Sequence, residues 1–261
     1  MFILHSTNGT LVLLLYVDDI ILTGNNDDLV TRFISRLGQE FSMTDLGEIH
    51  YFLGIEATRT DKGLFLSQSK YTIDLLHYIG MVGCKPCVTP VPSGSKLSAC
   101  EGTPLLDSKE YKQIVGTLQY LTLTRPDVSY VVKHMHAPTT SHLEAVKRIL
   151  RYLKHIIGAV TLLQAGPLDL TVAYTDVDWA GCPDTQRSTT GFCTFMGPNL
   201  ISWGSKKQPI VSRSSSEAKY KALAVTVSEM MWLSYILNDL HIASPQPMVV
   251  YCDNISATCM V

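Results

Sequence analysis

The sequence predicts an α/β (α+β) protein built from small sheets and helices. Short runs rich in β-branched and aromatic residues are separated by Gly, Asn and Asp, which is typical of strands and turns. Other stretches carry apolar residues at helical spacing, and the pattern changes near Gly166-Pro167. With 261 residues, the chain is long enough for one large domain or two ordinary ones.

The first 83 residues predict a three-strand antiparallel meander followed by a helix. Asn8-Gly9 is a strong hairpin signal, and Asp18-Asp19 forms a second tight turn. The helix should be capped by Asn26 or Asp27. The expected strands are Phe2–Ser6, Leu11–Val17 and Ile20–Thr23, and the helix should carry Leu29, Phe33, Ile34 and Leu37 on one face.

Two more strands and a helix should precede a long connector. The strands are expected at Ile49–Thr58 and Gly63–Ser67, and the helix at Lys70–Ile79. From Cys84 to about Ser108 the chain is rich in Pro, Gly and Ser, which is typical of a linking segment.

Two helices are expected after the connector. The first runs from about Tyr111 to Leu123, and the second begins at Ser141, which forms a capping box with Glu144. Four cations on the second helix suit a phosphate backbone, and a solvated charged face is the alternative. They are Lys147, Arg148, Arg151 and Lys154.

The part after residue 166 predicts a mixed sheet with helices packed on it. A long helix runs from about Ser215 to Leu240, and the chain ends in what resembles the first turn of another helix. The expected strands are Leu168–Thr175, Gly191–Met196, Leu200–Trp203 and Met248–Cys252.

Charge and cysteine content narrow the class of protein. The net charge of −2 gives no general attraction to nucleic acid, so such a site would have to come from local clusters. There is no secretion-signal pattern, and the early apolar run from Leu11 to Leu22 is too short to span a bilayer. Seven cysteines without a framework spacing favour reduced thiols. We therefore expect an intracellular protein of unknown compartment, neither secreted nor bound to a membrane.

Asp18 and Asp19 are the first candidate functional residues. Two adjacent carboxylates at a turn between apolar strands repel each other, and a turn needs at most one Asp. The pair makes physical sense if it holds divalent cations for phosphoryl transfer. An exposed hairpin tip is the alternative.

Asp176, Glu217 and Asp253 are a second candidate site. Alternation along a strand places Asp176 and Asp178 on the face of Leu170, Val172 and Tyr174, and Asp253 on that of Val249 and Tyr251. Glu217 opens the long helix, in register with a stripe expected to face the sheet. The stripe consists of Tyr220, Ala224, Val227 and Met231. Converging acids of this kind would bind two metals about 4 Å apart.

Each of these acids also has a purely local explanation. Glu217 could complete a capping box with Ser214, and Asp178 could cap the turn that follows it. Asp253-Asn254 could cap the terminal helix. Spacing alone does not decide between a shared metal site and these local roles.

The chain resembles copia-type retrotransposon Pol polyproteins over nearly its whole length. LLLYVDDIILTG is similar to their polymerase active-site hairpin, and FSMTDLGEIHYFLGIE, GLFLSQSKY, IVGTLQYLTLTRPDVSY and AVKRILRYLK are similar to successive blocks downstream. AYTDVDWAGCPDTQRSTTGFC, LISWGSKKQPIVSRSSSEAKYKALA and VYCDNISA resemble the ribonuclease H portion. The resemblance implies a reverse-transcriptase palm remnant at residues 1–83, a connector with thumb- or connection-like helices at 84–165, and an incomplete ribonuclease H-like domain at 166–261.

The resemblance also implies chemistry. Asp18 and Asp19 would be two of the polymerase's metal-binding acids, and Asp176, Glu217 and Asp253 the first three ribonuclease H carboxylates. The reaction would be hydrolysis of the RNA strand of an RNA–DNA hybrid, with Mg²⁺ as cofactor and Mn²⁺ as a substitute. Asp178 stands where the family also carries an acid, without being a primary ligand.

The sequence departs from the family pattern at both ends. The strand carrying the polymerase's other catalytic Asp is missing, so we expect no polymerase activity from this chain alone. The ribonuclease H pattern stops before its fourth metal-site residue, so we expect weak hydrolysis or none. RNA–DNA hybrid or template-primer is the expected partner, and the missing polymerase part is a further candidate partner.

Two other interpretations stay open. The chain could be a nucleic-acid-binding remnant that uses the four helix cations with Lys206 and Lys207, without chemistry. It could also be the product of a decayed open reading frame with no selected function.

Overall fold

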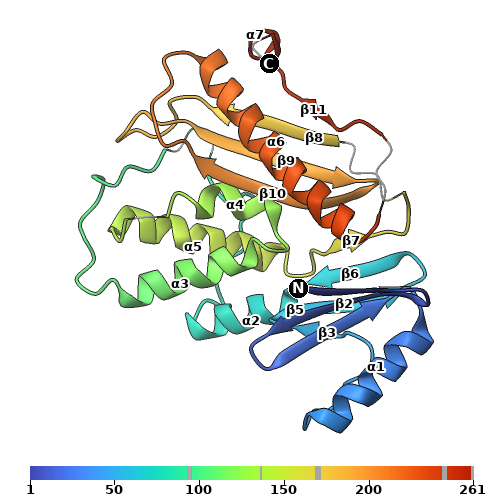
Figure 1. Ribbon diagram of the computed structural model, residues 1–261. Coiled ribbons are helices and arrows are strands. Elements are labelled where there is room, and N and C mark those ends of the chain that lie inside the picture. Colours follow the sequence, from blue (N-terminus) through green and yellow to red (C-terminus); the bar gives the residue numbers. More distant parts are fainter. Residues whose placement is uncertain (93, 95, 136, 168–171, 243–245, 260–261) are drawn as a thin grey trace.

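The computed structural model describes residues 1–259 apart from 93, 95, 136, 168–171 and 243–245. The described residues form three sheets and a layer of helices (Figure 1). This mixture of strands and helices confirms the predicted α/β class. No helix among these residues is long and apolar enough to cross a membrane.

The N-terminal meander forms as predicted, but both of its turns lie one residue early. Strands β1 (Phe2–Ser6), β2 (Gly9–Tyr16) and β3 (Asp19–Gly24) pair antiparallel in that order. Ser6 pairs with Gly9 and Tyr16 with Asp19, so the turns are 7–8 and 17–18. The Ser6 hydroxyl donates to the Gly9 carbonyl and accepts from the Asn8 N–H, which fixes the first turn.

Helix α1 (Asp27–Glu40) packs beside this meander, and a second sheet follows it. The Asn26 side chain accepts from the Leu29 N–H at 3.2 Å, which confirms the predicted cap. The predicted strand Ile49–Thr58 is split in two, because Leu53 and Gly54 adopt φ values of 48° and 76°. The sheet consists of β4 (Tyr51–Phe52), β5 (Ile55–Thr60), β6 (Gly63–Ser67) and the unpredicted β7 (Thr161–Leu163).

The main core lies in the helical layer. Its helices are α2 (Ser69–Tyr78), α3 (Lys109–Leu121), α4 (Pro126–Val132) and α5 (Thr140–His155). Helix α4 was not predicted, and α5 is capped by Thr139, not by the predicted Ser141–Glu144 box. Leu76 of α2 shares this core with Leu118 and Leu153, so residues on both sides of position 83 pack together.

The third sheet is mixed, as predicted. Its order is β10-β9-β8-β11, where β8 and β11 run parallel and the other neighbours antiparallel. The strands are β8 (Val172–Asp178), β9 (Thr189–Met196), β10 (Asn199–Lys207) and β11 (Val249–Tyr251). Helix α6 (Ser215–Asp239) covers β8 and β9, and α7 (Ile255–Thr258) follows (Figure 1). The predicted strand start at 168–171 lies outside the described residues.

The predicted sheet-facing stripe of α6 is wrong. Tyr220, Val227 and Met231 are 40–44% exposed, whereas Ala218 and Ala222 are fully buried. The helix is apolar on several sides, so its sequence does not fix its rotation. The small side chains of Ala218 and Ala222 face the sheet.

The predicted buried face of β8 is wrong in the same way. Ala173, Thr175 and Val177 are buried, and Tyr174 and Asp176 lie on the exposed face. The physical reason is that α6 packs on the face of Val177, where Ala218 and Ala222 complete a small core. Leu170, expected on the Asp176 face, lies outside the described residues.

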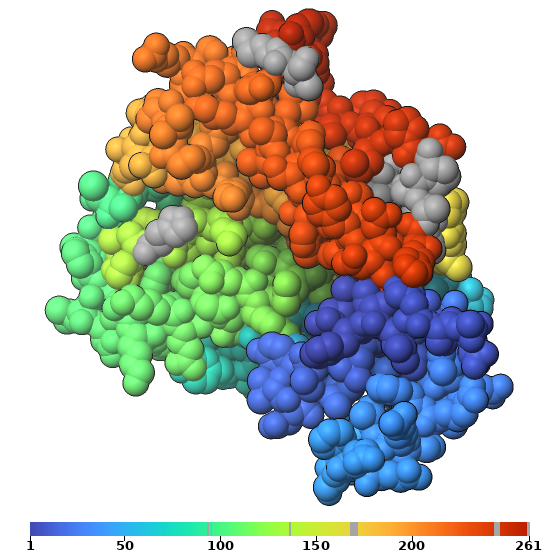
Figure 2. Space-filling view, in the orientation of Figure 1, coloured from blue at the N-terminus to red at the C-terminus, as the bar shows by residue number. Residues whose placement is uncertain are grey.

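The N-terminal meander also touches the end of α6. His5 Nε2 donates to the Asp239 carbonyl at 2.8 Å, and the His5 ring stacks on His241 at 3.6 Å between centroids. Figure 2 shows the two segments meeting at the surface, blue against red. This contact joins the first sheet to the end of α6, the helix that covers β8 and β9 of the third sheet.

Leu118→Ala should destabilise the helical core strongly. Leu118 is fully buried, so the cavity should lower the free energy of unfolding by about 2–5 kcal/mol. The control is Leu106→Ala, at an exposed leucine in the connector, which should change it by less than about 0.5 kcal/mol. Urea denaturation followed by circular dichroism measures both, and equal losses would contradict this placement of the core.

Asp127 should make stability depend on pH in the acid range. Burial raises its pKa, but hydrogen bonds from Arg125 and Tyr152 outweigh burial and hold the pKa below the usual 3.8. This stabilisation is complete above the usual value and is lost as the pH falls through the lowered pKa. The measurement is the free energy of unfolding of the parent and of Asp127→Asn between pH 6 and about pH 3. The difference between the two curves isolates the contribution of Asp127. Parallel stability curves would show that Asp127 contributes nothing.

Candidate functional site

Asp176 and Asp253 come together through the register of two parallel strands. Val249 pairs with Val172 and Tyr251 with Tyr174, so Asp253 lies beside Asp176 at the carboxyl ends of β11 and β8. The rings of Tyr174 and Tyr251 stack at 5.2 Å and fix this pairing. The two carboxylates are largely exposed, at 78% for Asp176 and 69% for Asp253.

Lys219 of α6 reaches this carboxylate pair. Its Nζ lies 3.3 Å from Oδ1 of Asp176 and donates a hydrogen bond to Oδ1 of Asp253. Its side chain is only 14% exposed. Burial lowers the pKa of Lys219, but both carboxylates raise it above its ordinary value, and the hydrogen bond from Lys219 lowers the pKa of Asp253. An ammonium group therefore lies between the two acids.

Glu217 points to different partners. Its Oε1 accepts from Lys221 Nζ at 2.7 Å, and its Oε2 accepts from the Arg213 N–H at 2.8 Å. Both contacts lower its pKa, the Lys221 contact most. Its own N–H donates to Ser214 Oγ, so Glu217 contributes to the N-terminal cap of α6. Residues two apart on a helix differ by about 200°, so Glu217 and Lys219 cannot both face the aspartates.

The donor atoms at this pair do not fit a two-metal centre. Within the described residues, no group of three His, Cys, Asp or Glu side chains could hold a metal ion. The third side chain that reaches Asp176 and Asp253 is Lys219. Lysine in its charged form has three donors and no lone pair for a metal.

Asp178 links the third sheet to the helical layer. Tyr130 of α4 donates to its Oδ2 at 2.9 Å. Burial and then the nearby Asp178 raise the pKa of Tyr130 to about 12. The carboxylate also lies over Gly181, where any Cβ would collide with it. These contacts give Asp178 a structural role at the junction between the third sheet and α4.

Asp18 and Asp19 lie at the exposed tip of the β2–β3 hairpin. Asp18 is in the turn, and Asp19 is the first residue of β3. Val17 occupies the left-handed region with φ of 49°, which is costly for a β-branched residue. The hairpin thus presents both acids to solvent, while the described residues supply no third metal ligand beside them.

The cations of α5 mostly hold the connector. Arg148 donates to Thr89 Oγ1 and Arg151 to the Lys85 carbonyl, each at 2.7 Å. Lys154 Nζ donates to the carbonyls of Val82 and Cys84 at 2.6 and 2.5 Å. Lys147 is exposed. Lys206 and Lys207 lie elsewhere, at the end of β10.

Comparison with known proteins gives a family match for the first part of the chain and relatives that match nearly all of it. Residues 1–93 match the family model for reverse transcriptase (RNA-dependent DNA polymerase). Over 99% of its length, the chain is 47% identical to the retrovirus-related Pol polyprotein from transposon RE1 of Arabidopsis thaliana, of which it covers 18%. It is 37% identical to that from transposon TNT 1-94 of Nicotiana tabacum, over 97% of the chain and 20% of that protein.

A shorter relative is matched over nearly its whole length. The chain is 50% identical to the uncharacterized mitochondrial protein AtMg00810 of Arabidopsis thaliana, over 85% of the chain and 94% of that protein. No solved structure matches the chain significantly. The chain spans about a fifth of the length of the first Pol polyproteins it matches.

These matches define a class of retroelement proteins with a reverse-transcriptase region. The chain belongs to the copia-type (Ty1/copia) retrotransposon Pol polyprotein family and includes the C-terminal region of its reverse transcriptase. Reverse transcriptases typically use divalent metal.

Lys219→Glu should create the metal site that the parent lacks. A carboxylate at position 219 would replace the ammonium between Asp176 and Asp253, giving three acids with no cation among them. We expect Mn²⁺ to bind with a dissociation constant of roughly 0.1–1 mM, measured by titration calorimetry. Lys221→Glu, which removes a partner of Glu217 instead, is the matched control. Equal Mn²⁺ affinity in the parent and Lys219→Glu would contradict the role of Lys219.

Proposed function

We propose that this region of a copia-type Pol polyprotein binds RNA–DNA hybrid through a ribonuclease H-like domain without hydrolysing it. One observation carries the loss of hydrolysis: Lys219 lies between Asp176 and Asp253, and Glu217 is turned away. Two-metal hydrolysis needs carboxylates that converge on cations. Here an ammonium group already occupies the space between the two acids and offsets part of their charge.

The ribonuclease H-like assignment is supported by the sequence motifs and the strand order. Three antiparallel strands lead into α6, and the next strand returns parallel beside the first. We propose a boundary near residue 166, because the third sheet and α6 come from the later residues. Residues 1–83 and 84–165 are proposed as palm-derived and connection-like parts of one unit, since they share the helical core.

Asp18 and Asp19 are proposed to keep a polymerase role only as part of a larger assembly. They are exposed and face no third acid within the described residues. The remaining acid, with Mg²⁺ or Mn²⁺ and the template-primer, would have to come together with another part of a Pol polyprotein. That part is the proposed protein partner of this chain.

The purified chain should bind an end-labelled RNA–DNA hybrid and leave it intact with Mg²⁺ and with Mn²⁺. Asp176→Asn should behave like the parent in both respects, because it removes no working metal ligand. Gel electrophoresis of the labelled RNA reports cleavage, and fluorescence anisotropy reports binding. Cleavage by the parent that disappears in Asp176→Asn would overturn the proposal and restore the hydrolase hypothesis.

A further inference from the structure

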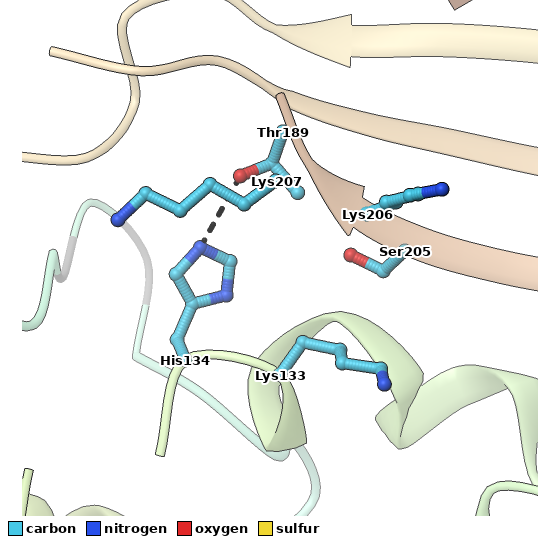
Figure 3. A pocket seen from close by; sticks show the side chains of 6 residues that line it. All are labelled: Lys133, His134, Thr189, Ser205, Lys206 and Lys207. Carbon is cyan, nitrogen blue, oxygen red and sulfur yellow. Dashed lines mark hydrogen bonds between the residues drawn. The ribbon is translucent and has the colours of Figure 1, made fainter. Parts of the chain in front are cut away.

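A cationic pocket lies between the end of α4 and strand β10, away from the carboxylate pair. Its volume is about 140 Å³. Figure 3 shows the lining side chains, which come from the end of α4, from β9 and from β10; Ser205 points toward α4, and Lys206 points away from Ser205. The six residues that line it are Lys133, His134, Thr189, Ser205, Lys206 and Lys207.

The lining has three lysines and no acid, and two of its members are already oriented by neighbours. Lys207 Nζ donates to Cys182 Sγ at 2.8 Å. His134 Nδ1 donates to the Tyr130 carbonyl at 2.8 Å, so its Nε2 accepts from Thr189 Oγ1 at 3.4 Å. Lys133 and Lys206 are both exposed and contribute positive charge at the pocket. Such a lining selects an anion.

Ser205 points to the same ligand independently. It is 7% exposed, and its buried Oγ has no hydrogen-bond partner among the described residues. Leaving a buried hydroxyl unpaired is costly, so such groups are normally satisfied by a neighbour or a ligand. A phosphate oxygen at the pocket would accept from Ser205 and lie near the charge of Lys133. Lys206 starts on the opposite face of β10, and because β10 is an edge strand its long side chain adds positive charge around that edge.

The pocket continues into a longer groove. An adjoining cavity of about 540 Å³ shares Lys133, Ser205 and Lys206 and extends to Phe192 and Trp203. A free phosphate would leave this groove empty, whereas a nucleotide chain would place a phosphate at the lysines and a sugar or base beside the aromatic rings.

The register of the sheet relates this pocket to the carboxylate pair. Asp176 pairs with Gly191, and Gly191 pairs with Ser205. Ser205 is therefore two strands from Asp176 in one row, about 10 Å away. We propose that Lys133, Lys206 and Ser205 form a phosphate site for the backbone of bound nucleic acid. This inference rests on the proposed hybrid-binding function and names where the backbone is held.

Charge reversal tests the site with the hybrid. Lys133→Glu with Lys206→Glu should weaken binding about tenfold or more and lower the slope of log K against log salt by roughly two. The matched control reverses Lys62 and Lys112, which are exposed and lie outside the pocket. Equal losses in the two double variants would overturn the site, because the attraction would then be nonspecific.

Inorganic phosphate tests the site separately from hybrid binding. We expect phosphate to shift resonances of residues around Ser205 in NMR titrations, and Ser205→Ala to weaken its affinity about fivefold. The control is Thr194→Val, at another buried hydroxyl without a partner among the described residues that lies outside the pocket. Circular dichroism confirms that both variants fold.

The two assays separate the two proposals. Phosphate binding at Ser205 without hybrid binding would keep the anion site and overturn the proposed function. Hybrid binding that is insensitive to Lys133, Lys206 and Ser205 would keep the function and overturn the site. Phosphate affinity unchanged in Ser205→Ala would also overturn it.

Discussion

The candidate site depends on one topological constraint, the parallel pairing of β8 with β11. Parallel neighbours cannot be joined by a tight turn and need a crossover. Here β9, β10 and α6 form the connection, and α6 packs closely on the sheet through Ala218 and Ala222, which are fully buried. Once β11 returns beside β8 in register, Asp253 must lie beside Asp176. The residue that α6 presents at this edge then decides what the two acids can do.

That residue is Lys219, and the three groups depend on one another. Two neighbouring carboxylates repel, and the ammonium between them offsets this repulsion. In turn, a lysine side chain only 14% exposed needs a charged partner at its end. A divalent metal would compete for the same oxygens against a cation that is covalently attached to the fold. The arrangement is therefore structural as it stands, and a change of charge at position 219 would alter its chemistry.

Local sequence patterns predicted most of the helices and strands. They failed where tertiary packing determines the position or the rotation of an element. Turn chemistry located the first hairpin but not its register, because the Ser6 hydroxyl bridges residues 6 to 9. The short elements α4 and β7 carry too few residues for a periodic signal. The sequence placed Asp176 and Asp253 at strand ends, and pairing brought them together. It missed Lys219 because α6 is apolar on several sides, so its rotation depends on the Ala218 and Ala222 contact with the sheet.

Cations that look equivalent in the sequence have different roles in the fold. The cluster on α5 predicted a nucleic-acid surface, but Arg151 and Lys154 donate to carbonyls of the connector. Those carbonyls lie in a segment without a strand or helix, so they need such partners. Lys133 and Lys206 come from distant segments and line a space that also holds the Ser205 hydroxyl, which has no partner among the described residues. A lysine that donates to carbonyls of its own chain stabilises the fold. Lysines beside an unpaired buried hydroxyl instead favour a ligand from outside the chain.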